Sequence, residues 1–277
     1  MSKFEILCVT MHQNDFSKIE QMNIHSDVVF ANQADKTAMD EIDFEGHRAR
    51  MITTDTRGVG INRNTTLLYA KGDICLFADD DVTYNDDVEE RVLAEFDAHP
   101  DADIIIFHLD TDSERKQVKY NKTKKCSRFC RMPWGAVRIA FRLSSVRKAN
   151  IWFTTLFGGG CVFPSGEDSM WLTAAKRSGL TFYVSKETIG TVSFGESSWF
   201  TGFDEKMYYG KGAFYQAVHP HTIYLWMIYF ALRSNFVSKL SFYQMIKWMN
   251  RGRNGYKKML SFKEWTENDK EKTVICK

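Results

Sequence analysis

The strongest constraint on the fold is the alternation of short apolar runs with amphipathic stretches over the first 110 residues. Five apolar runs have the length of buried strands: residues 4–10, 27–32, 48–54, 73–78 and 102–109. A run that is apolar at nearly every position suits a strand covered on both faces. Such strands alternating with helices predict an α/β fold with a mostly parallel sheet and right-handed crossovers.

Helical patterns separate these runs at residues 15–23, 59–71 and 86–98. In open parallel sheets, ligands bind beyond the carboxyl ends of the strands. We therefore look for function in the residues that directly follow each strand.

The second part of the chain is less regular until residue 167. Residues 167–177 have acids in the first turn and bases in the last, as a helix dipole favours. Residues 181–185 and 189–194 predict two further strands.

The net charge of +2 conceals an uneven distribution. Residues 1–110 contain 9 Lys and Arg against 23 Asp and Glu, whereas residues 206–263 contain 10 Lys and Arg and no acid. We expect an α/β domain at 1–205 and a basic, aromatic-rich helical extension at 206–277. A basic segment of this kind is a candidate for binding an anionic surface.

Several classes of protein are disfavoured. Cys126 and Cys130 have no second Cys or His pair nearby, which disfavours zinc, and the cysteine usage suggests a reducing compartment. Residues 1–10 are strand-like, unlike a signal peptide, and the longest apolar segment, 222–232, is shorter than the about 20 residues that span a bilayer. We expect a cytoplasmic protein, and no recognised module suggests nucleic-acid binding.

The sharpest chemical signal is the run of Asp79, Asp80 and Asp81 directly after the strand at 73–78. Adjacent carboxylates repel one another, and a divalent cation resolves the conflict. Mg²⁺ and Mn²⁺ prefer oxygen ligands, often one or two carboxylates and substrate phosphates. The alternative is a solvated turn that precedes the next helix.

Two further features carry a weaker signal. Glu167 and Asp168 begin a helix behind a glycine-rich loop, so they either stabilise the helix start or supply a general base. Arg57 and Arg63 flank another helix start, where guanidinium and backbone N–H groups can hold phosphate. Glycines 58 and 60 do not complete a dinucleotide-binding G-x-G-x-x-G motif.

Together these motifs resemble a known family. The order is an N-terminal strand, ANQAD at 31–35, RGVGINRNTTLLYAKGDICLFADDDVTYNDD at 57–87, and Gly-Glu-Asp at 166–168. This pattern resembles family 2 glycosyltransferases of the GT-A fold, a Rossmann-like sheet flanked by helices. The resemblance covers roughly residues 4–200 and is greatest to bacterial members that build surface polysaccharides.

The resemblance implies roles for the carboxylates. Asp79 would contact the ribose of a nucleotide-sugar. Asp81 would ligate the metal that bridges the diphosphate, and Asp79 would share this metal. Asp80 fills the variable middle position and lies at the nucleotide-sugar site. Asp168 would deprotonate the acceptor hydroxyl, with Glu167 beside it.

The resemblance also implies nucleotide contacts. Thr10, after the first strand, and Gln33 and Asp35, after the second, would contact the nucleotide base. Arg63 would lie near the diphosphate or the base. Asp35 carries the weaker assignment, because the family often has a richer acidic signature than ANQAD at this point.

The expected activity is metal-dependent and inverting. With Mn²⁺ or Mg²⁺, a sugar would pass from a nucleotide-diphosphate sugar, UDP-linked by preference, to a hydroxyl of a glycan or lipid-linked glycan. One alternative is a sugar-phosphate nucleotidyltransferase, which is disfavoured because VTMHQND at 9–15 is no glycine-rich basic loop. Another is a non-catalytic sugar-nucleotide-binding scaffold subunit.

The remaining candidates have competing interpretations. Trp134, Arg138 and Trp199, together with Arg142, suit an acceptor site, or else pack in the core. His219 or His221 would complete a metal shell, or else be exposed or capping residues. The extension would form interfacial helices on the anionic inner face of the cell membrane, or an ordinary appendage with a solvated basic face.

Overall fold

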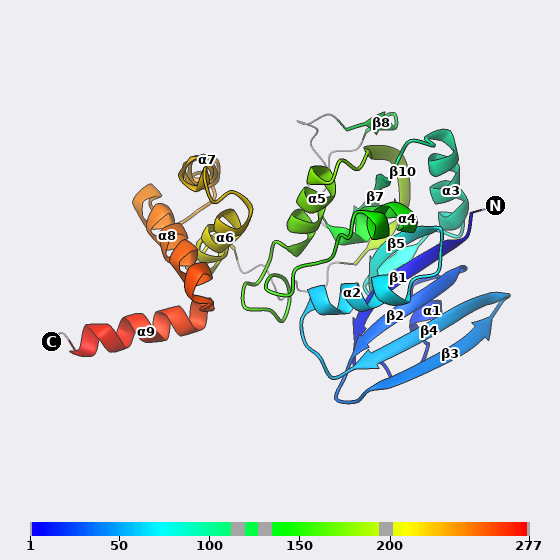
Figure 1. The fold of residues 1–277 in the computed structure, drawn as a ribbon, viewed down its shortest axis with the longest axis horizontal. Coiled ribbons are helices and arrows are strands. Elements are labelled where there is room, and N and C mark those ends of the chain that lie inside the picture. Colours follow the sequence, from blue (N-terminus) through cyan, green and yellow to red (C-terminus); the bar gives the residue numbers. More distant parts are fainter. Residues whose placement is uncertain (1, 112–119, 127–134, 194–201, 276–277) are drawn as a thin grey trace. The chain divides into compact units, whose positions relative to one another are not determined.

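The computed structural model describes residues 2–111, 120–126, 135–193 and 202–275. The chain divides into two compact units (Figure 1). An α/β unit contains Met1–Thr154 and Glu167–Gly195, and a helical unit contains Thr155–Gly166 and Glu196–Lys277. We describe each unit by itself.

Half of the sheet in the α/β unit is parallel and consists of apolar runs that the sequence predicts. Strand β1 (Phe4–Met11) lies between β2 (Asp27–Gln33) and β5 (Ile74–Asp79), and β4 (His47–Thr54) pairs with β2. Because these strands run in the same direction, the carboxyl ends of β1, β2 and β5 meet at one edge of the sheet (Figure 1).

The other half of the sheet is mixed. A strand from the basic region, β9 (Ile139–Arg142), lies between β5 and β7 (Ile104–Thr111) and is antiparallel to both. Strand β7 also pairs in parallel with β10 (Phe182–Val192), which replaces the two strands predicted at 181–185 and 189–194. The prediction of two strands was wrong because β10 crosses this polar stretch with register shifts instead of ending.

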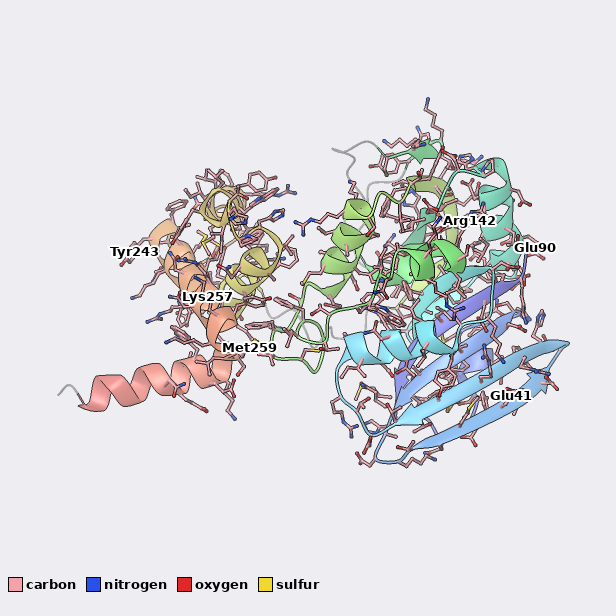
Figure 2. All side chains as sticks on the ribbon, in the orientation of Figure 1. Glu41, Glu90, Arg142, Tyr243, Lys257 and Met259 are labelled. Carbon is pink, nitrogen blue, oxygen red and sulfur yellow. The ribbon has the colours of Figure 1, made fainter. Side chains whose placement is uncertain are left out.

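Three other strands have no apolar signature and were not predicted. They are β3 (Ala38–Phe44), β6 (Val82–Tyr84) and β8 (Lys124–Lys125). Strand β3 forms the edge of the sheet, antiparallel to β4, and its five central residues are exposed. Figure 2 shows Glu41 on this strand. An edge strand that is exposed in this way needs no buried apolar face, so periodicity does not reveal it.

Helices cover both faces of the sheet, and each face has its own core. The bounds are α1 (Lys18–Gln21), α2 (Val59–Tyr69), α3 (Val88–Ala98), the 3₁₀ turn η1 (Ala136–Arg138), α4 (Leu143–Lys148) and α5 (Glu167–Arg177). Residues of α3 enter one core, whereas residues of α2, α4 and α5 enter the other. The helix predicted at 15–23 is reduced to α1, a single turn.

A buried ion pair ties the amino end of β1 to β4. Arg50 donates to Glu5 at 2.5 Å, and both side chains are almost completely buried. The second Glu5 oxygen accepts the backbone N–H groups of Lys71 and Gly72, so the carboxylate is fully satisfied. A buried charge of this kind is tolerated only with such partners.

The helical unit contains the predicted C-terminal helices. They are α6 (Glu205–Val218), α7 (Ile223–Ser234), α8 (Phe242–Lys258) and α9 (Phe262–Ile275). Asp204 caps α6 by accepting the N–H of Met207, and Ser241 and Gln244 form a capping box at the start of α8. The domain limits expected at 205 and 206 remain a prediction, since compactness alone does not show which part folds independently.

Glycines bring α6 and α8 into backbone contact. A Cβ placed on Gly212 would lie 1.9 Å from the carbonyl oxygen of Met249, and one on Gly252 would lie 1.8 Å from that of Tyr209. Neither position therefore tolerates a side chain without separating the helices. Among the helices that the structure describes, none is long and apolar enough to cross a membrane.

Candidate active site

The carboxyl edge of the sheet gathers the residues that follow β1, β2 and β5. Thr10 is buried at the end of β1, and its hydroxyl donates to the Asp80 carboxylate. Lys18 of α1 donates to the Asp80 carbonyl oxygen at 3.1 Å, and its ammonium lies 3.8 Å from the carboxylate. Thr10 and Asp80 are thus brought together as expected, whereas Lys18 had no sequence motif to mark it.

Arg63 connects the two groups of acidic residues. Its side chain, on α2, is only 4% exposed. One guanidinium nitrogen donates to Asp79 at 3.0 Å, and the other donates to Asp168 at 2.6 Å and Glu167 at 3.3 Å. The sequence places Arg63 near a diphosphate or base, but it does not reveal this bridge between carboxylates.

The carboxylates keep this buried guanidinium charged. Burial by itself lowers the pKa of Arg63, but the charges of Asp168, Asp79 and Glu167 outweigh it and raise the pKa above its usual value. Arg63 also lies 5.3 Å from the ring centroid of Phe153, a cation–π distance. The residue is therefore a fixed cation beneath the site.

Asp168 is held by the main chain as well as by Arg63. It lies in the first turn of α5, and one carboxylate oxygen accepts the N–H of Ala136 at 2.9 Å. Ala136 begins η1, which runs directly into β9, so the sheet fixes the position of this donor.

The surroundings of Asp168 and Glu167 favour their protonated forms. Burial raises the pKa of Asp168, the charge of Arg63 opposes this, and the charge of Asp79 adds to it. Burial, followed by the charge of Asp168, raises the pKa of Glu167. A carboxylate with a raised pKa is a stronger base than an ordinary surface carboxylate.

Asp81 differs from its neighbours. Burial and the charge of Asp79 raise the pKa of Asp81 to about 6. Asp79 and Asp80 have the partners given above, but Asp81 forms no ion pair with a described side chain. A cation beside Asp79 and Asp81, in addition to Arg63, would relieve the repulsion between these two carboxylates. The pair therefore fits a divalent ion that also binds phosphate.

The part of the chain that the structure describes does not by itself assemble a complete metal site. Among the described residues, no group of three or more His, Cys, Asp and Glu side chains is arranged to hold an ion. Two carboxylates completed by substrate phosphates would not form such a group. Mn²⁺ or Mg²⁺ therefore stays a prediction.

The proposed nucleotide contacts after β2 have protein partners. Gln33 is buried, and its amide donates to the carbonyl oxygen of Gly58 at 3.2 Å. Asp35 is exposed and pairs with Arg57. Neither arrangement by itself tests base recognition.

Asn62 is a positioning residue that the sequence did not single out. Its amide donates to the carbonyl oxygens of Thr10 at 3.1 Å and Ala31 at 2.8 Å. It thereby fixes the ends of β1 and β2 to α2, next to Arg63. The N-R-N segment contains Asn62, but only tertiary structure shows its role.

The acceptor candidates are located only in part. Arg138 is buried and donates to the carbonyl oxygen of Leu109 at 3.4 Å, and burial lowers its pKa. Arg142 faces Ile74 at the start of β5, the opposite end of that strand from Asp79. Trp134 and Trp199 lie outside the described residues. Their acceptor roles stay predictions.

The two candidate histidines belong to the helical unit. The His219 ring stacks on Trp226 with centroids 4.6 Å apart, and His221 is exposed. This stacking gives His219 a packing role, and metal binding by either histidine stays a prediction.

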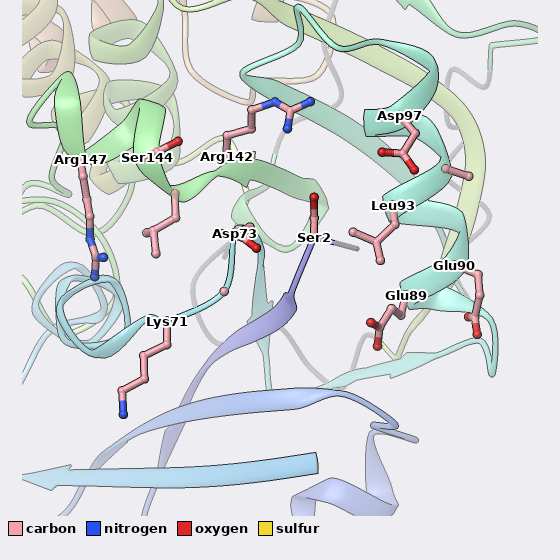
Figure 3. Close-up of a pocket in the computed structure, with 13 residues that line it drawn as sticks. Ser2, Lys71, Asp73, Glu89, Glu90, Leu93, Asp97, Arg142, Ser144 and Arg147 are labelled. Carbon is pink, nitrogen blue, oxygen red and sulfur yellow. The ribbon is translucent and has the colours of Figure 1, made fainter. Parts of the chain in front are cut away.

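A cavity of about 1290 Å³ lies away from the carboxylate cluster (Figure 3). Its lining includes Asp73, just before β5, Glu89 and Asp97 of α3, and Arg147 of α4. It therefore adjoins the amino end of β5, whereas ligands of such sheets bind at carboxyl ends. We do not assign the active site to it.

Comparison with known proteins decides the family. The family model described as glycosyl transferase family 2 matches residues 28–160. This segment belongs to glycosyl transferase family 2. It contains Gln33, Asp35, Arg63 and the three consecutive aspartates, and it ends before Glu167. A comparison with curated protein sequences gives no significant match.

The fold of the chain is GT-A, as the sequence predicts. The structure of S. aureus TarS residues 1–349 is similar with a TM-score of 0.59 at 15% identity, covering 94% of this chain and 93% of that one. The same TarS fragment in complex with UDP-GlcNAc has a TM-score of 0.57 at 13% identity, with the same coverage. The complex with UDP has a TM-score of 0.55 at 15% identity and covers 95% of this chain and 76% of that one.

Proposed function

We propose that the protein is a metal-dependent, inverting glycosyltransferase that moves a sugar from a UDP-sugar to a hydroxyl of a glycan or lipid-linked glycan in surface-polysaccharide synthesis. The observation that carries the proposal is the Arg63 bridge, which holds Asp79 and Asp168 at one guanidinium. The last residue of β5 and a residue in the first turn of α5 thereby share one site. TarS, which has the same fold, binds UDP-GlcNAc and UDP.

The donor would lie across the carboxyl edge of the sheet. Thr10, Gln33 and Asp35 would contact the nucleotide there, and Lys18 would supply a cation beside Asp80. Asp79 and Asp81 would hold the metal, which when bound neutralises negative charge on the leaving diphosphate. Arg63 keeps Asp79 fixed while being too deeply buried to act as a mobile phosphate ligand.

Asp168 would act on the acceptor. Its carboxylate would take the proton of the acceptor hydroxyl as the hydroxyl oxygen bonds to the anomeric carbon. The bond from that carbon to the diphosphate oxygen breaks, UDP leaves with the electron pair, and the configuration inverts. The contacts of Asp168 with Arg63 and the Ala136 N–H would orient the carboxylate.

The family match and donor turnover distinguish this proposal from its alternatives. The family 2 match supports sugar transfer over nucleotidyl transfer by a sugar-phosphate nucleotidyltransferase. A non-catalytic scaffold would bind the donor without turnover. We further propose that the enzyme works in the cytoplasm at the inner face of the cell membrane, where lipid-linked acceptors are found.

The test is release of UDP from a panel of UDP-sugars, measured with added Mn²⁺, with Mg²⁺ and with EDTA. We expect one sugar to support turnover that EDTA abolishes, and the Asp168→Asn variant to bind that donor but lose most of the turnover. The matched control is Asp40→Asn, an exposed aspartate on β3. An Asp168→Asn protein with wild-type turnover would remove Asp168 from the mechanism, and donor binding without turnover in the wild type would support the scaffold.

A further inference from the structure

Helix α7 exposes an apolar face although it is well packed on its other side. Its buried residues are Ile223, Met227, Ala231 and Ser234, a narrow stripe at helical spacing. The large exposed residues are Tyr224, Leu225, Trp226, Ile228, Tyr229 and Leu232. Surface helices usually carry charged or polar residues at such positions. The exposed side of α7 therefore needs an explanation other than packing within the helical unit.

The exposed apolar surface continues past the end of α7. Phe236 is 94% exposed in the turn that follows, and Val237 beside it is also exposed. Phe242 and Tyr243 at the start of α8 are exposed as well; Tyr243 is labelled in Figure 2. We call the large exposed side chains of α7 given above, together with Phe236 and Val237, the α7 surface.

Cations border the α7 surface. Arg233 donates to the hydroxyl of Tyr229 at 3.1 Å, and Arg253 of α8 donates to that of Tyr224 at 2.6 Å. Lys239 is exposed in the turn after Val237. The sequence from 206 to 263 contains no acid at all, so no carboxylate of this stretch neutralises these charges.

We propose that the α7 surface binds a lipid bilayer that contains anionic lipids, with α7 lying in the plane of the interface. Tyrosine and tryptophan prefer the interface, leucine and isoleucine enter the acyl region, and bordering cations bind anionic headgroups. A helix of 12 residues is about 18 Å long, too short to span the bilayer but sufficient to lie on it. The surface would bring the enzyme to lipid-linked acceptors, and in that respect it rests on the proposed function.

A lipid surface fits these observations better than a second protein does. In a symmetric contact between two copies the two α7 surfaces would face each other, and residues 206–263 contain no acid to match the cations. Anionic lipid supplies that charge together with the apolar layer. Each cation near such a surface strengthens binding by about fivefold.

The test is co-sedimentation with two kinds of vesicle. One contains phosphatidylcholine alone, and the other contains phosphatidylcholine with about one anionic phosphatidylglycerol in three lipids. We expect the full-length protein to bind only the anionic vesicles tightly. Leu225→Glu should weaken this binding by about tenfold or more, because a leucine side chain no longer enters the apolar layer. Lys239→Gln should weaken binding to the anionic vesicles by about fivefold.

The matched control is Leu68→Glu on α2 of the α/β unit, where Leu68 is 65% exposed against 69% for Leu225. This variant should bind vesicles like the wild type. The proposal is overturned if the wild type stays unbound with anionic vesicles, if both vesicle types bind it equally, or if Leu225→Glu binds as well as Leu68→Glu. It is also overturned if light scattering shows a wild-type oligomer that Leu225→Glu dissociates and vesicles do not bind.

Release of UDP from the donor, measured without lipid on the same preparations, separates this proposal from the proposed function. Vesicle binding without donor turnover would support membrane binding by the α7 surface and contradict the proposed glycosyltransferase activity. Donor turnover without vesicle binding would contradict the surface alone.

Discussion

Replacing Arg63 by methionine tests whether the buried guanidinium holds the acidic cluster together. Methionine has a similar length and no charge, so the variant leaves Asp168 and Glu167 close together without their cation. Both carboxylates are mostly buried, with 22% and 14% of their side chains exposed. Removing one partner of a buried ion pair costs about 3–5 kcal/mol. The lost contact with Asp79 adds less to this free-energy cost, because Asp79 is more exposed and solvent screens its charge.

The cost should depend on pH in a defined direction. Burial raises the pKa of Asp168 and of Glu167 even with Arg63 present, and loss of Arg63 removes an opposing charge. A group with a raised pKa in the folded state stabilises the protein at low pH and loses this effect as the pH rises through that pKa. The difference in free energy of unfolding between wild type and Arg63→Met should therefore be largest near pH 8 and shrink towards pH 5.

The assay is urea unfolding at several pH values, monitored by tryptophan fluorescence, since Trp171 of α5 is buried in the core. The control is Arg48→Met, because Arg48 also has two carboxylate partners, Glu41 and Asp43, but is exposed. We expect this control to change stability little at any pH. A loss below about 1 kcal/mol for Arg63→Met, the range of exposed pairs, or a loss independent of pH, would refute the reasoning.

Three further predictions concern packing and accessibility. Gly252→Ala should destabilise the helical unit by about 1–3 kcal/mol or more, because its Cβ would enter the α6 backbone. Gly210→Ala, whose Cβ would make only ordinary contacts, should not destabilise it. Thermal unfolding of the two variants tests the difference. Glu5→Gln should cost about 3–5 kcal/mol in urea unfolding, since it leaves a buried arginine uncompensated, and an unchanged midpoint would contradict this. Burial raises the pKa of the Cys8 and Cys75 thiols, so mass spectrometry after treatment with a thiol reagent should find both unmodified in the folded protein and modified in urea.

The sequence predicts the strands that are buried on both faces, because burial favours apolar residues at nearly every position. Strands β1, β2, β4, β5 and β7 all meet this condition, so their positions are close to those expected. Strand β3 is exposed and polar, and β9 is four residues long in a basic region. Neither leaves a pattern that a single sequence can reveal.

The candidate site was predictable as a set of residue types but not as a set of contacts. Asp79 stands out because it follows a recognisable strand, and Asp168 because it lies at the start of a recognisable helix. Their common partner, Arg63, is 105 residues from Asp168 along the chain, and the contact exists because α2 and α5 cover the same face of the sheet. Lys18 and Asn62 carry no motif, so their places emerge only from the fold.

The hydrogen bond from the Ala136 N–H to Asp168 has a consequence for how the enzyme can change over evolution. A main-chain donor survives every substitution at its own position except proline, which has no N–H. Most substitutions in the surrounding loops therefore leave the orientation of Asp168 unchanged. Under the proposed function, residues that select the acceptor can diversify while the sheet keeps the Asp168 carboxylate in place, so new specificities would arise without changes around it.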